Sequence, residues 1–164
     1  MGRRLRYVAL ALLGAVIALI VIVKFRYAGK APVKLSAEFC SADLWQHVYE
    51  PARLQVIEAC TEVEGRIVST RRASDGDFHI GLDPDLKSVL NLANVMHARS
   101  ELVVEVICDH TPTGSDVKVS CGDFHYDVTI PKVGDRVRVI GAYVTDRDNG
   151  WNEIHPVSRI EILH

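Results

Sequence analysis

The sequence lacks the short motifs by which common catalytic sites are recognised. It contains no G-x-S-x-G nucleophile elbow, no H-E-x-x-H zinc motif and no glycine-rich loop that cradles phosphate. No serine, histidine and aspartate stand at a spacing that would name a triad. We therefore assign no catalytic residue and no cofactor from motifs, and we expect a binding role rather than catalysis.

Basic charge is scarce once the N-terminus is set aside. Six of the 19 lysines and arginines lie within residues 1–30, which leaves 13 basic residues against 21 acidic ones and a net charge near −8. Nucleic-acid binding usually needs a basic footprint, and single strands also need aromatic side chains along a basic groove. Arg66, Arg71 and Arg72 cluster beside the first expected strand, which is more typical of a solvated rim than of a phosphate site. The charge argues against nucleic acid, and a membrane-tethered single-strand binder is kept only as an alternative.

An uncharged apolar run covers residues 7–23, with three arginines before it and three basic residues after it by residue 30. Its 17 residues reach the short end of the roughly 17–25 that a membrane helix needs. The run is longer than the roughly 7–15 residue core of a cleavable signal, and no small-residue cleavage site follows. We expect residues 1–30 to form a retained signal anchor that crosses the membrane through residues 7–23. A cleaved signal peptide is the alternative.

Four cysteines follow the expected anchor, and an even number suits disulfides. Cys108 and Cys121 flank a turn-prone segment, so proximity favours their pairing and leaves Cys40 to pair with Cys60. Three connectivities are possible for four cysteines. Disulfides persist in oxidising compartments, so we expect a cytoplasmic N-terminus and an extracytoplasmic domain. Four thiols in a cytoplasmic domain are the alternative, and the absence of C-x-x-C spacing argues against a zinc–cysteine site.

Alternating hydrophobicity dominates the chain after a linker. Residues 31–53 are expected to form this linker and a short docked helix or turn over 38–50, and residues 84–100 show a second helix-like spacing. The Asp-Gly pair at 75–76 predicts a hairpin turn, and Gly65 indicates a bulge or bend. Strands are predicted over residues 61–72, 77–83, 101–109, 135–146 and 152–163.

Five strands with a glycine in the first predict an all-β domain over residues 54–164, built as a small closed barrel. The five-stranded oligonucleotide/oligosaccharide-binding (OB) barrel is the best match. Its usual helix lies between the third and fourth strands, whereas the second helix expected here lies between the second and third. An immunoglobulin-like sandwich is the alternative, although it needs about seven strands.

Three segments carry a resemblance: "VEGRIVSTRRASDGDFHIGLD", "ELVVEVIC" and "VGDRVRVIGAYVTDRDNGWNEIHPV". Together they resemble prokaryotic OB-fold domains of unknown function, which are often exported or membrane-tethered. The resemblance covers residues 54–163, and its most specific parts are "DGDFHI" and "GWNEIHPV". It implies a fold and a general binding role, but it brings no catalytic residues with it.

Polar side chains recur at every second position on three of the expected strands. Side chains of one parity share a face of a strand, so these groups should lie together on the outer surface, opposite the apolar parity. The candidate ligand-binding residues are Asp77, His79, Glu105, Trp151, Glu153 and His155.

This polar face has three interpretations. Barrel strands normally keep polar residues outside, so the face can simply stabilise the sheet by cross-strand pairs. It can also bind a ligand, such as a protein, a glycan or a small anion. Imidazole and carboxylate together can hold a divalent metal or exchange protons, and a metal-dependent hydrolase would use Asp77, His79, Glu153 and His155.

Overall fold

The computed structural model describes residues 32–113 and 118–164. The expected membrane anchor over residues 7–23 lies outside them. Within the described residues, no helix has the length and hydrophobicity needed to cross a bilayer.

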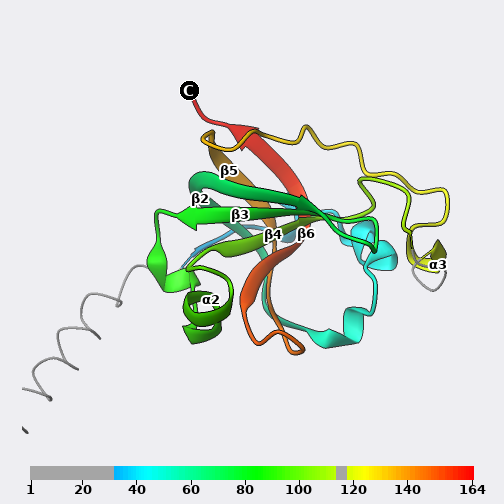
Figure 1. The fold of residues 1–164 in the computed structure, drawn as a ribbon, viewed down its shortest axis with the longest axis horizontal. Coiled ribbons are helices and arrows are strands. Elements are labelled where there is room, and N and C mark those ends of the chain that lie inside the picture. The colour runs from blue at the N-terminus through cyan, green and yellow to red at the C-terminus, as the bar shows by residue number, and fades with distance from the viewer. Residues whose placement is uncertain (1–31, 114–117) are drawn as a thin grey trace, which may run out of the picture. The chain divides into compact units, whose positions relative to one another are not determined.

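Six strands form one mostly antiparallel sheet, and the sheet closes partly into a ring (Figure 1). Their order is β1-β2-β3-β4-β6-β5, and β2 also pairs with β5, which brings the two sides of the sheet together. Only β4 and β6 run parallel among these pairs. The expected mostly-β ring with few short helices is confirmed, with β1 as an additional strand. The bounds are β1 Val33–Lys34, β2 Leu54–Arg72, β3 Phe78–Pro84, β4 Leu102–Val106, β5 Arg136–Asp146 and β6 Asn152–Ile162.

Strand β2 starts earlier than the sequence predicted. It was expected from residue 61, but it begins at Leu54 and its first part pairs with the end of β5. Its register shifts between Val56 and Glu58 and again between Glu58 and Thr61. These irregularities leave the neighbours Val56 and Ile57 both exposed, so the two-residue period is absent where the strand begins.

Gly65 lies at a close approach between strands rather than at a bulge. It pairs with Pro84 of β3 on one side and with Val137 of β5 on the other, and the register shifts of β2 occur elsewhere. A Cβ at this position would lie 2.9 Å from the Cα of Pro84. The residue therefore serves to bring three strands together.

The helical segments are short, as expected. Residues 38–50 form separate 3₁₀ turns, because the disulfide of Cys40 ties one end to β2 and Glu50 adopts a left-handed conformation at the other. In residues 84–100 the helix α2 ends before Arg99 and Ser100, which both have positive φ. The bounds of the helical segments are Ala37–Phe39, Ala42–His47, Pro51–Arg53, Lys87–Val89, α2 Leu92–His97 and α3 Lys118–Cys121.

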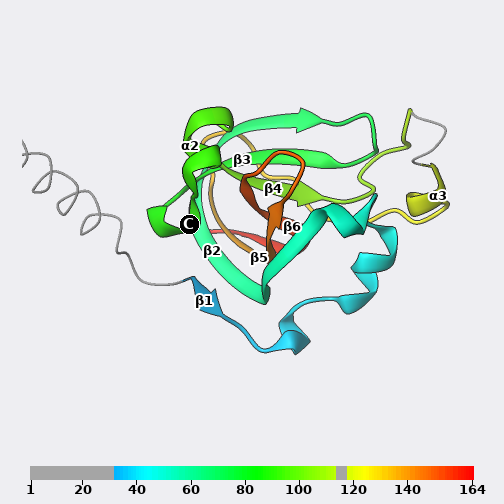
Figure 2. The same cartoon turned by 90° about the horizontal axis from the view of Figure 1, so that it is seen from below.

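Two apolar clusters lie on opposite faces of the sheet. The first fills the inside of the ring and is made of alternate residues from all five long strands, such as Ile67, Val104 and Ile154. The second lies on the outer face, where the turn at 42–47 and the segment around Cys121 pack against the sheet. Figure 2 shows the N-terminal turns and α3 outside the ring of strands. Its buried members are Leu44, Val48, Leu54, Ile107, Cys108, Cys121, Ala142 and Val144.

Gly141 marks a tight crossing between β5 and β6, where the register between these strands shifts. A Cβ added there would lie 2.6 Å from both the Ile154 Cγ2 and the Pro156 backbone oxygen. We expect Gly141→Ala to lower the free energy of unfolding by about 2 kcal/mol, since overpacking of a close-packed interior costs about 1–3 kcal/mol. Urea unfolding followed by circular dichroism measures it. The control is Arg159→Ala on β6, which should change stability by less than about 0.5 kcal/mol. Equal stability of Gly141→Ala and the unchanged protein would refute the close approach.

Candidate functional site

The six predicted ligand-binding residues come together at one place. His79 on β3 pairs with Glu105 on β4, and the parallel pairing of β4 with β6 brings Glu153 beside Val103. Asp77 precedes β3, and Trp151 and His155 flank Glu153 along the chain. The shared parity thus places these side chains on the same face of neighbouring strands.

The expectation that this face is open to solvent is wrong for most of it. Glu153 and His155 are 0 % exposed, and Asp77 and Glu105 are 3 % exposed. The second apolar cluster explains this burial, because the 3₁₀ turn at 42–47 and the segment of Cys108 and Cys121 cover the outer side of the sheet. His79 and Trp151 lie at the edge of this cover and are half-buried.

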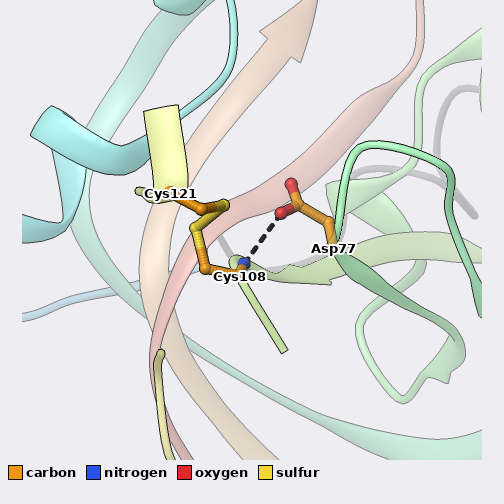
Figure 3. Close-up of side chains that lie close together, drawn as sticks. All are labelled: Asp77, Cys108 and Cys121. Atoms are coloured by element: carbon orange, nitrogen blue, oxygen red, sulfur yellow. Dashed lines mark hydrogen bonds between the residues drawn. A yellow bond between two sulfur atoms is a disulfide. The ribbon is translucent and has the colours of Figure 1, made fainter. Parts of the chain in front are cut away.

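The predicted pairings Cys40–Cys60 and Cys108–Cys121 are both present. The second disulfide lies beside Asp77, whose Oδ1 accepts a hydrogen bond of 2.9 Å from the backbone N–H of Cys108 (Figure 3). Because the two sulfurs are bonded to each other, they offer no thiolate to a metal. Their structural effect is to fix the backbone that orients the Asp77 carboxylate.

His155 is held between two buried carboxylates. Its Nδ1 lies 2.8 Å from Glu105 Oε2 and 3.2 Å from Glu153 Oε1, with the hydrogen bond directed to Glu153. Burial alone would lower the pKa of His155, but the two carboxylates outweigh burial and raise it to about 10. The indole N–H of Trp151 donates to Glu153 Oε2 at 3.0 Å, so Glu153 is fixed from both sides.

The pKa values of the two carboxyl groups beside His155 are shifted in opposite directions. Burial would raise the pKa of Glu105, but the charges of His155, His79 and Arg53 lower it to about 2. The pKa of Glu153 is raised, first by burial and then by the neighbouring charge of Glu105.

Asp77 carries the other strongly shifted carboxyl of the site. Burial and the nearby carboxylate of Asp75 raise its pKa to about 7, against the opposing effects of His155 and the Cys108 N–H. Such shifts mark a site where negative charge is crowded away from water.

A second buried ion pair connects the N-terminal segment to the sheet. Arg53, at the end of a 3₁₀ turn, donates to Asp146 at the end of β5, and its Nη2 lies 3.8 Å from Glu105 Oε2. Asp146 is 1 % exposed and also accepts hydrogen bonds from Asp148 and Asn149. The pair therefore links the turn, β5 and the loop that follows β5.

Two hollows open at the edge of this buried cluster, and both are lined by Arg71, His79 and Trp151. We name them by their charge. The basic hollow has a volume of about 480 Å³, and its polar lining includes Arg71, His79, His97, Arg99 and Glu101. The acidic hollow has a volume of about 290 Å³, and its charged lining is Glu50, Arg53, Arg71, Asp75, His79, Glu105, Asp146 and Asp148.

The two guanidinium groups of the basic hollow differ in their partners. Arg99 is paired with Glu101, whose carboxylate also accepts from Ser69. Arg71 is exposed, and its Nη2 donates to His79 Nδ1 at 2.8 Å. Among the described residues, Arg71 pairs with no carboxylate. Burial lowers the pKa of His79 despite the opposite effect of Glu105, which suits a neutral ring that accepts this bond.

The site has a buried part, the His–carboxylate cluster, and an accessible part, the two hollows. The buried His–carboxylate cluster has no access for an organic substrate at His155 or Glu153, so general acid–base catalysis by these groups is not favoured. The hollows, in contrast, present Arg71, His79 and Trp151 at an accessible edge.

Compared with known protein families and with curated proteins, the chain matches none.

Three residues of the site were not predicted from the sequence. Arg71 was interpreted as a solvated rim, yet it lies directly across from His79 in the β2–β3 pairing. The Asp-Gly turn at 75–76 was a signal for this register, because it sets which residues of the hairpin face each other. No local sequence pattern indicates the pairing of Arg53 with Asp146, because they lie 93 residues apart and meet only when the N-terminal segment docks.

Removal of the Arg53 charge tests this docking. We expect Arg53→Met to lower the free energy of unfolding by about 3 kcal/mol, because it leaves the buried Asp146 carboxylate without its counter-ion. Urea unfolding measures the change. The matched control is Arg159→Met, which removes a guanidinium that is 62 % exposed and paired with Glu161, and it should change stability by less than about 0.5 kcal/mol. Equal effects of the two variants would contradict a buried pair.

Proposed function

We propose that this chain is a membrane-anchored, extracytoplasmic protein whose OB-like barrel binds a small anionic ligand without transforming it. The strand order supports the OB-like interpretation, since β3, β4 and β6 are neighbours and the β2–β5 pairing closes the five long strands. The apolar run at residues 7–23 and the two disulfides support the proposed compartment.

The observation that carries the binding role is the guanidinium of Arg71 in the basic hollow. It is exposed, it pairs with no carboxylate of the described residues, and His79 holds it in place through Nδ1. A guanidinium recognises carboxylate and phosphate through charge-assisted hydrogen bonds. An anion in the basic hollow would give Arg71 the partner that it lacks.

The neighbours of Arg71 favour a small and partly polar ligand. Ser69, Thr70 and His97 supply polar groups around the hollow, and Trp151 offers an aromatic surface at its side. A hollow of about 480 Å³ is within the roughly 300–1,000 Å³ typical of small-molecule sites. A carboxylated sugar or a phosphate ester suits this combination of cation, hydroxyls and aromatic ring.

A metal-dependent hydrolase using Asp77, His79, Glu153 and His155 is less well supported. Such an enzyme would need the histidines and carboxylates to surround an open position for substrate. Glu153 and His155 are fully buried, and the Nδ1 of His79 already accepts from Arg71. The accessible groups of this edge are suited to binding rather than to activating water.

Ligand binding is tested with chemically defined probes. Isothermal titration calorimetry of the purified full chain should detect inorganic phosphate, citrate or galacturonate, with neutral galactose as the uncharged comparison. Arg71→Gln should lower the affinity for the anion by about tenfold or more, because hydrogen bonds to charged groups contribute about 1.5–3 kcal/mol. Arg159→Gln, outside both hollows, should bind as the unchanged protein does. The proposal is wrong if no anion binds, if galactose binds as well as galacturonate, or if Arg71→Gln has no effect.

The compartment is tested by thiol labelling in cells that express the full chain. We expect the chain in the membrane fraction and no maleimide labelling of the denatured protein until a reductant is added, since both disulfides should be formed. After reduction all four cysteines should react. Labelling of the four thiols without reductant would instead support the alternative of a cytoplasmic domain.

A further inference from the structure

Asp77, Glu105 and His155 converge beneath the acidic hollow. Each offers one ligand atom, and the three atoms lie within 4.8 Å of one another. The residues come from three separate segments: the turn before β3, the strand β4 and the strand β6. We propose that this group is a binding site for a divalent transition-metal ion, with Zn²⁺ as the best fit.

Two buried polar atoms of the group make no hydrogen bond with the described residues, His155 Nε2 and Glu105 Oε2. His155 Nε2 has no ion-pair partner among them either, whereas Glu105 Oε2 lies 2.8 Å from His155 Nδ1 as part of the ion pair. Buried polar atoms normally have partners, because desolvation without one costs about 1–3 kcal/mol. Asp77 uses Oδ1 for the Cys108 N–H, and its second oxygen makes no hydrogen bond with the part of the chain that the structure describes. A metal ion would satisfy all three residues at once.

The charge of the cluster also calls for a cation. Arg53 lies against both Asp146 and Glu105, and His155 lies between Glu105 and Glu153, so these two cations face four buried carboxyl groups, those of Asp77, Glu105, Asp146 and Glu153. Burying several carboxylates together is strongly unfavourable without opposite charge. A divalent ion supplies two positive charges at the point where Asp77 and Glu105 approach each other, whereas a proton on His155 supplies one.

Glu153 and Trp151 are suited to an outer role. The Nδ1 of His155 is directed to Glu153 Oε1, and the other oxygen of Glu153 accepts the indole N–H of Trp151. A histidine that binds a metal usually gives its second ring nitrogen to a carboxylate, which fixes the tautomer and the ring orientation. Glu153 therefore orients His155, and a metal ion bound at the unpartnered Nε2 would replace the proton on that nitrogen.

One imidazole with two carboxylates favours Zn²⁺ over Mg²⁺ or Ca²⁺, which prefer oxygen ligands alone. Donor atoms around a tetrahedral ion with bonds of about 2.0–2.1 Å lie about 3.4 Å apart, so the three residues, whose ligand atoms lie within 4.8 Å of one another, would have to move closer together. Access exists because Glu105 lines the acidic hollow, where carboxylates outnumber guanidinium groups. His79 and Glu153, which the sequence analysis placed in a metal site, are not ligands in this arrangement.

The test uses the full chain after treatment with a chelator and removal of the chelate. Titration with Zn²⁺ in a calorimeter should show one site, and bound Zn²⁺ should raise the melting temperature. Asp77→Asn and Glu105→Gln should each weaken this binding at least tenfold. The matched control is Asp148→Asn, which makes the same change as Asp77→Asn at an exposed position of the acidic hollow and should bind Zn²⁺ normally.

Circular dichroism of each variant before titration confirms that it is folded. If one of the two variants does not fold, the other, in a different segment, still tests the site. Absence of Zn²⁺ binding to the unchanged chain would overturn the proposal. Binding that Asp77→Asn and Glu105→Gln leave unchanged would overturn it as well, because the ion would then be held by other histidines. The result does not depend on anion binding, since Arg71→Gln should keep its affinity for Zn²⁺.

Discussion

The imidazole of His155 lies between the carboxylates of Glu105 and Glu153 in the interior of the protein, and this interaction constrains the architecture around it. Charged groups leave water only when opposite charge and hydrogen bonds replace the solvent, since the penalty is several kcal/mol per ion. The face that carries them is enclosed by other segments of the chain, so each of its charges needs a partner within the protein. The docked N-terminal turns, the Arg53–Asp146 pair and the Cys108–Cys121 disulfide provide that enclosure.

The burial of this cluster also explains why the accessible functional groups lie at its edge. Arg71 and His79 of the β2–β3 hairpin and Trp151 of the loop before β6 line both hollows. His79 connects the two environments, because its Nδ1 accepts from the exposed Arg71 and lies 3.5 Å from the buried Glu105. A ligand bound at Arg71 would thus lie next to the buried cluster without entering it.

Several elements could be predicted from the sequence because their signals are local. The alternation of apolar residues located β3, β5 and β6 to within about a residue at each end, and the turn at 75–76 specified a hairpin. The start of β2 was missed because its bulges break the alternation at Val56 and Ile57. Of the short helix or turn expected over 38–50, the structure has turns, because a disulfide and a left-handed residue confine that segment.

The sequence by itself determined which residues share a face, since the two-residue period of a strand groups Glu153 with His155 and the hairpin register sets Arg71 against His79. It also indicated both disulfides, through the spacing of the cysteines. Only the tertiary structure decided whether the polar face meets solvent or protein, because parity says nothing about what packs above a strand. The cover comes from residues such as Leu44 and Arg53, which are distant in sequence, and their docking turned an expected outer surface into a buried ionic cluster.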